Sequence, residues 1–183
     1  SNILIKIEQP ANALKVLAEG IESHPDDADL LYARAMLAEQ QGNFSLAESD
    51  LLKIISRDAD NVSALNALGY TMLLHTDRLD EAFNFIKRAY TLKPDSPAII
   101  DSMGWALFKR GEMREALDFL KRAMAKMPDP EIAAHLGEIY WTLGDEVKAI
   151  KTWSQGLKKV PNAVQIISTM KRLGISLQKR NDN

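Results

Sequence analysis

A segment of about 34 residues repeats along this chain, and the repetition constrains the fold more than any other feature of the sequence. Three consecutive repeats contain an apolar residue followed by glycine: Leu68-Gly69, Met103-Gly104 and Leu136-Gly137. Further along, each repeat has an alanine, a large apolar residue, a second small residue and a proline. These positions hold Ala82, Ile86, Ala89 and Pro94 in residues 62–96, Ala116, Leu120, Ala123 and Pro128 in residues 97–129, and Ala149, Trp153, Gly156 and Pro161 in residues 130–163. Repeats in register over this length predict an array of small structural units.

Two further copies precede these three. Residues 28–61 form a weaker copy that keeps the apolar and small positions Leu31, Ala35, Ala38, Ala47 and Leu51. Residues 1–27 match only the second half of a repeat, so we expect a truncated preceding repeat there. The apolar residues Ile3, Leu4 and Ile7 are then expected to face an earlier repeat of a longer array.

The spacing within each repeat predicts two antiparallel helices. Side chains three and four residues apart lie on one face of a helix, and a glycine such as Gly69 or Gly104 on that face lets the second helix approach closely. Gly42, Gly111 and Gly144 stand where the first helix of a pair should end, as a left-handed cap requires. In residues 62–96 this glycine is missing, and Thr76-Asp77 is expected to take its place.

Helix ends follow from the same signals. Asn61, Ser96 and Asp129 are expected to cap helices, with Pro97 and Pro130 as first helical residues. Helices are therefore expected near residues 8–22, 28–41, 44–57, 62–75, 79–92, 97–110, 113–126, 130–143, 146–159 and 163–173, and no stretch alternates long enough to be a strand.

The last predicted helix, within residues 164–175, is expected to cap the array. Its apolar residues Val164, Ile167 and Met170 should cover the preceding repeat, while Gln165, Lys171 and Arg172 face water. Residues 176–183 are polar and are predicted to be disordered.

The pattern of Leu-Gly, alanine, apolar residue and proline resembles the tetratricopeptide repeat (TPR) family over residues 1–163. This resemblance implies an all-α fold, a right-handed superhelical solenoid of helix-turn-helix hairpins with repeats at 28–61, 62–96, 97–129 and 130–163. The segments Ala67-Leu68-Gly69-Tyr70 and Asp101-Ser102-Met103-Gly104 are similar to the C-terminal repeats of long proteobacterial TPR proteins. Some of those are outer-membrane lipoproteins facing the periplasm, and some are adaptors for a processing protease. A bacterial scaffold in the cell envelope is implied, with the cytoplasm as the alternative.

In the TPR family, certain positions of each first helix commonly face a concave groove. Carried over, they give a predicted partner-binding surface of Tyr32, Met36, Asn66, Tyr70, Asp101, Trp105, Phe108, Glu138 and Trp141, with Glu39, Leu73 and Glu131 beside them. Aromatic side chains on such a surface suit a protein ligand. The alternative is that Tyr70, Trp105 and Trp141 pack between neighbouring hairpins, because large apolar side chains at helical spacing are usually core.

The family's clamp for chaperone C-terminal carboxylates needs lysine, arginine and asparagine at five positions. Those positions here hold Tyr32, Met36, Ala67, Ala98 and Ser102. A free carboxylate tail is therefore not the expected ligand. With Asp101, Glu131 and Glu138 nearby, the groove should accept a neutral or basic segment with apolar anchors.

Charge and composition exclude several other classes of function. The chain has 23 basic and 25 acidic side chains, a formal net charge of −2, and no lysine- or arginine-rich run, so nucleic acid is not an expected partner. It contains no cysteine, and no apolar run approaches the roughly 20 residues that span a bilayer. His24, His75 and His135 fall in different repeats, so no metal site or other cofactor is expected.

Asp101, Ser102 and His135 are the residue types of a hydrolase triad. Adjacent residues on a helix point roughly 100° apart, however, and His135 would have to serve both Asp101 and Ser102. A hydrogen bond between Asp101 and His135 of adjacent hairpins is the preferred interpretation, and no enzyme is expected.

Two functions remain open. The favoured one is a scaffold or adaptor that binds a partner segment in the groove. The alternative is a structural module that self-associates or packs on missing N-terminal repeats, with no groove ligand.

Overall fold

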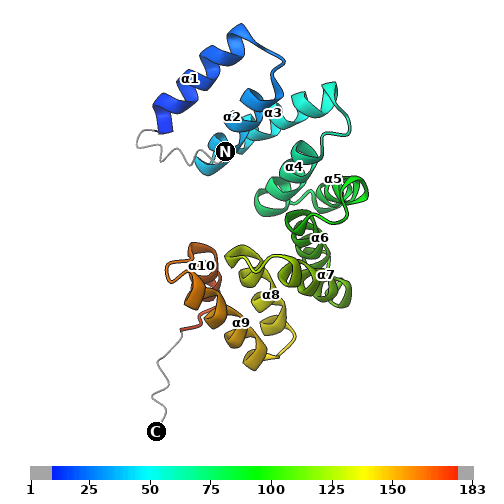
Figure 1. The fold of residues 1–183 in the computed structure, drawn as a ribbon, viewed down its shortest axis with the longest axis vertical. Coiled ribbons are helices and arrows are strands. Elements are labelled where there is room, and N and C mark those ends of the chain that lie inside the picture. Colours follow the sequence, from blue (N-terminus) through cyan, green and yellow to red (C-terminus); the bar gives the residue numbers. More distant parts are fainter. Residues whose placement is uncertain (1–9, 177–183) are drawn as a thin grey trace. The chain divides into compact units, whose positions relative to one another are not determined.

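The computed structural model describes residues 10–176, which form helices joined by short loops, with no strand in that range (Figure 1). The chain divides into two compact units, Ser1–Lys93 and Pro94–Asn183, hereafter unit 1 and unit 2. The described helices of unit 1 are α1 (Pro10–Ser23), α2 (Ala28–Gln40), α3 (Phe44–Arg57), α4 (Val62–His75) and α5 (Leu79–Leu92). Those of unit 2 are α6 (Pro97–Lys109), α7 (Met113–Lys126), α8 (Pro130–Thr142), α9 (Glu146–Lys159) and α10 (Val164–Arg172).

The predicted helices are confirmed, with ends at or within a residue or two of the expected positions. Their hairpins are α2–α3 and α4–α5 in unit 1, and α6–α7 and α8–α9 in unit 2. Helices α2, α4, α6 and α8 begin at the first residues of the four predicted repeats, although the repeat boundaries themselves stay a prediction. The predicted start of the first helix, the packing of Ile3, Leu4 and Ile7, and most of the predicted disordered tail lie outside the described residues.

Local caps set most of the helix ends. Gly42, Gly111 and Gly144 have φ of 77°, 82° and 79°, which confirms the left-handed caps. After α4, Thr76 takes over this role, because both its N–H and its hydroxyl donate to the carbonyl of Met72.

Asn61, Ser96 and Asp129 all occupy the predicted N-cap positions. Asn61 accepts a hydrogen bond from the N–H of Ala64, and Asp129 accepts one from the N–H of Glu131. The side chain of Ser96 makes no capping bond at the start of α6. Pro97 supplies the first helical residue there and already fixes φ for the helix.

In the hairpins α4–α5, α6–α7 and α8–α9, the two helices approach closely at a glycine of the first helix. A Cβ built on Gly69 would lie 2.6 Å from Ile86 Cγ1, and one on Gly104 would lie 2.7 Å from Leu120 Cγ. The tightest contact is at Gly137, where a Cβ would lie 2.2 Å from Nε1 of Trp153. Glycine is therefore required at these positions by packing rather than by backbone conformation.

A bidentate ion pair, which the sequence patterns do not reveal, also joins α2 to α3. Arg34 donates from Nε and Nη2 to the two carboxylate oxygens of Asp50, each at 2.7 Å, and Asp50 is buried. The pair satisfies a carboxylate that would otherwise be costly to bury.

The terminal helix α10 packs on α8 and α9, but through a different face from the predicted one. Met170 is buried as expected, whereas Val164 and Ile167 are 71% and 45% exposed. Ile166 is fully buried instead, because Gly156 leaves room for it: a Cβ there would lie 2.4 Å from Ile166 Cδ1. The small residue of α9 thus selects which side of α10 faces inward.

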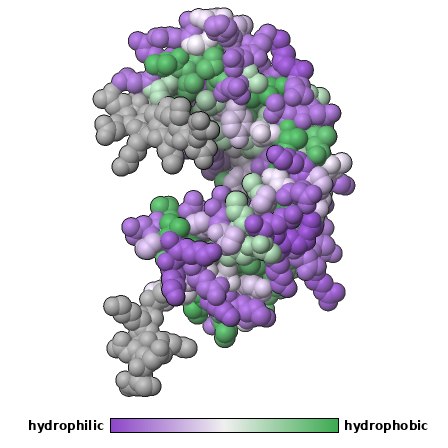
Figure 2. All heavy atoms as spheres, viewed as in Figure 1, coloured by the Kyte–Doolittle hydropathy of each residue, from purple (hydrophilic) through white to green (hydrophobic). Residues whose placement is uncertain are grey.

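No helix among the described residues is long and apolar enough to cross a membrane. The surface carries separate apolar patches bordered by polar side chains (Figure 2).

Candidate protein-binding surface

In unit 1 the predicted ligand-contacting residues lie on α2 and α4. Tyr32 and Met36 are four residues apart on α2, as are Asn66 and Tyr70 on α4, so each pair shares a helix face. All four side chains are half-buried. This partial exposure leaves part of each side chain open to a ligand.

A polar contact links α2 to α4 near these residues. Nε2 of His75 lies 3.5 Å from Oε1 of Glu39, and the His75 ring stacks on Phe44 with centroids 3.6 Å apart. Both members of the Glu39–His75 pair keep about a quarter of their side chains exposed (25% and 26%).

Two polar side chains in this part of unit 1, Tyr32 and Asn66, have unusual surroundings. Burial, and secondly the charge of Glu39, raises the pKa of Tyr32, so its phenol stays a neutral donor over the physiological range. The amide oxygen of Asn66 is buried and has no hydrogen-bond partner in the described part of the chain. Such an atom is unusual in a folded protein and favours a partner group that the chain alone does not supply.

In unit 2 the corresponding positions are mostly buried and bonded to each other. Nδ1 of His135 on α8 lies 3.0 Å from both carboxylate oxygens of Asp101 on α6, which confirms the predicted hydrogen bond. Burial opposes the charged form of His135, but the charge and hydrogen bond of Asp101 outweigh it and raise the pKa of His135. Glu131 and Glu138 add smaller contributions in the same direction.

Trp105 belongs to this buried cluster rather than to an open groove. Its side chain is 4% exposed and stacks on His135, with ring centroids 4.1 Å apart and an interplanar angle of 15°. Phe108 stacks on it from the same helix at 5.0 Å, and Lys109 Nζ lies 5.3 Å from the ring centroid. For this aromatic, packing between hairpins is the alternative that holds.

Glu138 is also engaged within the protein. It is 6% exposed and accepts a hydrogen bond from Nη2 of Arg172 on α10. Arg172 was expected only to face water, so this contact was missed. The available signal was the spacing: Glu138 and Arg172 are 34 residues apart, as are Asp101 and His135.

Phe108 and Trp141 remain half-buried on α6 and α8. Trp141 also contacts Trp153 of α9, with ring centroids 6.2 Å apart. The half-buried residues on first helices form one candidate surface in each unit, which we call the first-helix surface of that unit: Tyr32, Met36, Asn66 and Tyr70 in unit 1, and Phe108 and Trp141 in unit 2. In unit 2, Asp101, Trp105 and Glu138 are buried and contact residues of the next repeat or of α10.

The residues that suggested a triad do not form one. The Ser102 hydroxyl donates to the carbonyl of Ala98 on its own helix, 3.0 Å away. Ser102 is therefore not positioned as a nucleophile for the Asp101–His135 pair. No group of three or more histidine, aspartate or glutamate side chains within the described range could hold a metal ion.

Comparisons with known proteins identify the repeat. Sequence models described as Tetratricopeptide repeat match residues 73–137, 1–61 and 32–97. The chain belongs to the tetratricopeptide repeat family.

Individual relatives show the same relationship. This TPR chain is 45% identical over 131 residues to the TPR repeat-containing protein PA4667 of Pseudomonas aeruginosa, covering 72% of this chain and 22% of that protein. It is 22% identical over 161 residues to Tetratricopeptide repeat protein 8 of Caenorhabditis elegans, covering 86% and 31%. The chain thus spans less than a third of the length of these two relatives.

Solved structures show the fold. The thermophilic TPR protein TTC0263 of Thermus thermophilus superposes with a TM-score of 0.77 at 20% identity, covering 91% of each chain. Pseudomonas aeruginosa pilF gives a TM-score of 0.66 at 19% identity, covering 90% of this chain and 86% of that one. The all-α TPR solenoid expected from the repeat is therefore confirmed.

Proposed function

We propose that this TPR chain is a protein-binding scaffold whose ligands lie against the first-helix surface of each unit. TPR solenoids in general serve as scaffolds for other proteins. The observation that carries the proposal for this chain is the set of half-buried residues on its first helices: the fifth and ninth residues of α2 and α4 in unit 1, and the twelfth residues of α6 and α8 in unit 2. Tyrosine, tryptophan and phenylalanine supply large contact areas at a low cost in conformational entropy.

The proposed ligand is a neutral to basic segment with apolar anchors. Half-buried aromatic rings receive the anchors, and the unpartnered amide oxygen of Asn66 accepts from a backbone N–H after a small side-chain rotation. The acidic side chains favour a basic ligand less strongly than the sequence alone indicates, because Asp101 is bonded to His135 and Glu138 to Arg172. Any preference for basic ligands then rests on carboxylates that keep part of their side chain exposed, such as Glu39, which is 25% exposed beside His75.

Site-specific photo-crosslinking tests this proposal. A benzoylphenylalanine is placed at Phe108 on α6, and as a matched control at Phe119 on α7, which is also a half-buried phenylalanine of unit 2 but lies on a second helix. The experiment is done in bacterial cells, and the crosslinked segments are sequenced by mass spectrometry. We expect Phe108, but not Phe119, to crosslink one partner through a neutral or basic segment with apolar side chains.

Two results would contradict the proposal. Equal crosslinking of the same partner at Phe119 would place binding elsewhere. Crosslinks from Phe108 only to a second copy of this chain would favour the self-associating structural module instead. Fractionating the cells before analysis also tests the expected envelope location against the cytoplasm.

A further inference from the structure

An ion pair recurs at the same end of three successive hairpins. In each case an aspartate stands two residues before the first helix and pairs with a cation in the last turns of the second helix. The pairs are Asp26–Arg57 at 2.6 Å, Asp60–Arg88 at 2.7 Å and Asp95–Lys126 at 3.0 Å. They are exposed and individually weak, but they show that this geometry brings a loop carboxylate to the end of the second helix.

The hairpin α8–α9 lacks this pair because its preceding loop is shorter. The loops before α2, α4 and α6 are residues 24–27, 58–61 and 93–96, whereas the loop before α8 is only 127–129. Pro128 stands two residues before α8, where the other loops have aspartate. The adjacent Asp129 cannot substitute, because its carboxylate caps α8 by accepting from the Glu131 N–H at 2.8 Å.

The cation of the missing pair is nevertheless present. Lys159 is the last residue of α9, as Arg57 and Lys126 are the last residues of α3 and α7. Neither Lys159 nor its neighbour Lys158 forms an ion pair within the described part of the chain. Unit 2 therefore has two ammonium groups at a position where earlier hairpins have a neutralised one.

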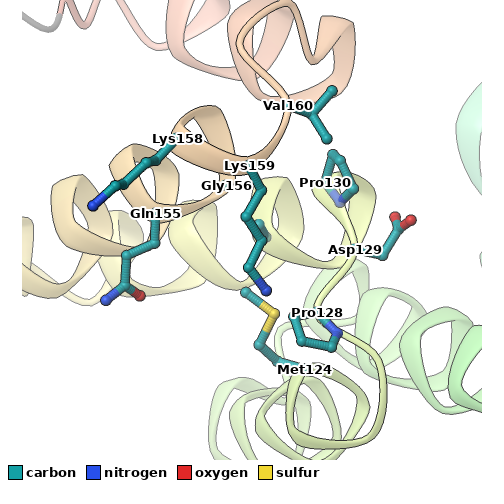
Figure 3. Close-up of a pocket in the computed structure, with 10 residues that line it drawn as sticks. Met124, Pro128, Asp129, Pro130, Gln155, Gly156, Lys158, Lys159 and Val160 are labelled. Carbon is teal, nitrogen blue, oxygen red and sulfur yellow. The ribbon is translucent and has the colours of Figure 1, made fainter.

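A cavity of about 760 Å³ opens at this point, between the ends of α7 and α9 and the start of α8 (Figure 3). Its apolar lining includes Met124, Pro128, Pro130, Ala133 and Val160. Figure 3 shows Lys159 running from α9 toward Met124 and Pro128, while the Asp129 carboxylate points away from it. The volume lies within the range of roughly 300–1,000 Å³ typical of ligand pockets.

We propose that this cavity binds an acidic segment of a partner protein. An apolar side chain of that segment contacts Met124, Pro128 and Ala133, and a neighbouring carboxylate pairs with Lys159, in place of the aspartate that the shorter loop removed. Charge complementarity favours an acidic occupant, because Lys158 and Lys159 form no ion pair with any residue that the structure describes, and the Asp129 carboxylate in the lining caps α8. The cavity shares no residue with the first-helix surface, so either binding proposal can be contradicted without affecting the other.

A titration followed by backbone NMR shifts tests this inference. The probe is a blocked peptide in which leucine is followed by two aspartates, and the matched probe has asparagines in their place. We expect the acidic peptide to shift amides at the ends of α7 and α9 and in residues 127–130. Lys159→Glu should weaken its binding on the order of fivefold or more, whereas Lys151→Glu should leave it unchanged, because Lys151 is exposed on α9 outside the cavity.

A second variant makes the test independent of removing a charge. Pro128→Asp restores a loop carboxylate opposite Lys159 and should weaken the acidic peptide while circular dichroism shows unchanged helicity. The inference is overturned if the asparagine peptide binds equally well, if Lys151→Glu and Lys159→Glu weaken binding equally, or if the shifts map to the first-helix surface. Crosslinking at Phe108 remains a separate readout of the proposed scaffold function.

Discussion

Side chains at equivalent positions of the two units have different roles. The fifth residue of α4 in unit 1 is Asn66, which is half-buried and whose amide oxygen has no hydrogen-bond partner among residues 10–176. The fifth residue of α6 in unit 2 is Asp101, which is buried and bonded to His135 of the next hairpin. Four residues further along, Tyr70 is half-buried whereas Trp105 is covered by the His135 ring.

The difference shows that a repeat position does not have a fixed role. A polar or aromatic side chain on a first helix becomes structural when the following hairpin supplies a partner, as His135 does for Asp101 and Trp105. In unit 1, Asn66 and Tyr70 at the same positions stay half-buried, with part of each side chain open to a ligand. Unit 1 therefore has more half-buried first-helix residues, while unit 2 has buried bonds between neighbouring repeats.

Removing Asp101 should give the largest difference in free energy of unfolding between a variant in unit 2 and its counterpart in unit 1. Asp101→Ala leaves His135 buried without its carboxylate, and breaking such a buried pair typically costs about 3–5 kcal/mol. Asn66→Ala removes an amide whose oxygen has no partner and should cost less than about 1 kcal/mol. Urea unfolding followed by circular dichroism measures both, and equal losses for the two variants would show that the positions are equivalent after all.

Adding one methyl group to a helical glycine should have opposite effects in the two units. Gly137→Ala places a Cβ against the buried indole of Trp153, and overpacking of this kind costs about 1–3 kcal/mol. In unit 1, Gly20→Ala meets only the flexible end of Leu30, at 3.2 Å, and should be neutral or stabilise α1 by up to about 1 kcal/mol. Thermal unfolding of both variants checks the sign, and a stable Gly137→Ala would show that Trp153 can move.

The sequence predicts features set by residues close together in the chain better than features set by contacts between separate helices. Helix ends were predictable because caps such as Asn61 and Gly111 are local features. The face of α10 was not, since neighbouring residues point roughly 100° apart and the choice of Ile166 over Ile167 depends on the space above Gly156.

In the candidate site, two polar contacts join residues that lie one repeat apart, and the sequence predicts only one of them. Asp101–His135 was predicted, whereas Glu138–Arg172 was missed although its spacing is the same, because Arg172 had been assigned to the water-facing side of the last helix. The burial of Trp105 depends on how one aromatic ring lies over another, and no sequence period specifies that.

The buried pair also predicts a pH dependence of unit 2. The folded-state pKa of His135 is raised, so the stabilisation from its charged form is fully present below its unfolded pKa, near 6.5. That stabilisation is lost as the pH rises through the folded-state pKa. Urea unfolding at a series of pH values should show falling stability over this window, and His135→Gln should remove that part of the slope. An unchanged slope in His135→Gln would assign the effect to other groups.

The smallest expected effects concern the partly exposed polar contacts. Removing one of them should cost nearly the same free energy of unfolding in either unit. The Arg172 side chain is 56% exposed, so its removal opens the carboxylate of the buried Glu138 to water, and Arg172→Ala should cost about 1 kcal/mol, less than Asp101→Ala. Lys171→Ala is the matched control, because Lys171 is its exposed neighbour on α10, and it should change stability by less than about 0.5 kcal/mol. In unit 1, His75→Gln removes a pair in which both side chains are about a quarter exposed, and it should also cost less than about 1 kcal/mol. A loss at Arg172 as large as that of Asp101→Ala would mean that α10 depends on this single contact, and that bonding between hairpins in unit 2 extends undiminished to its last described helix.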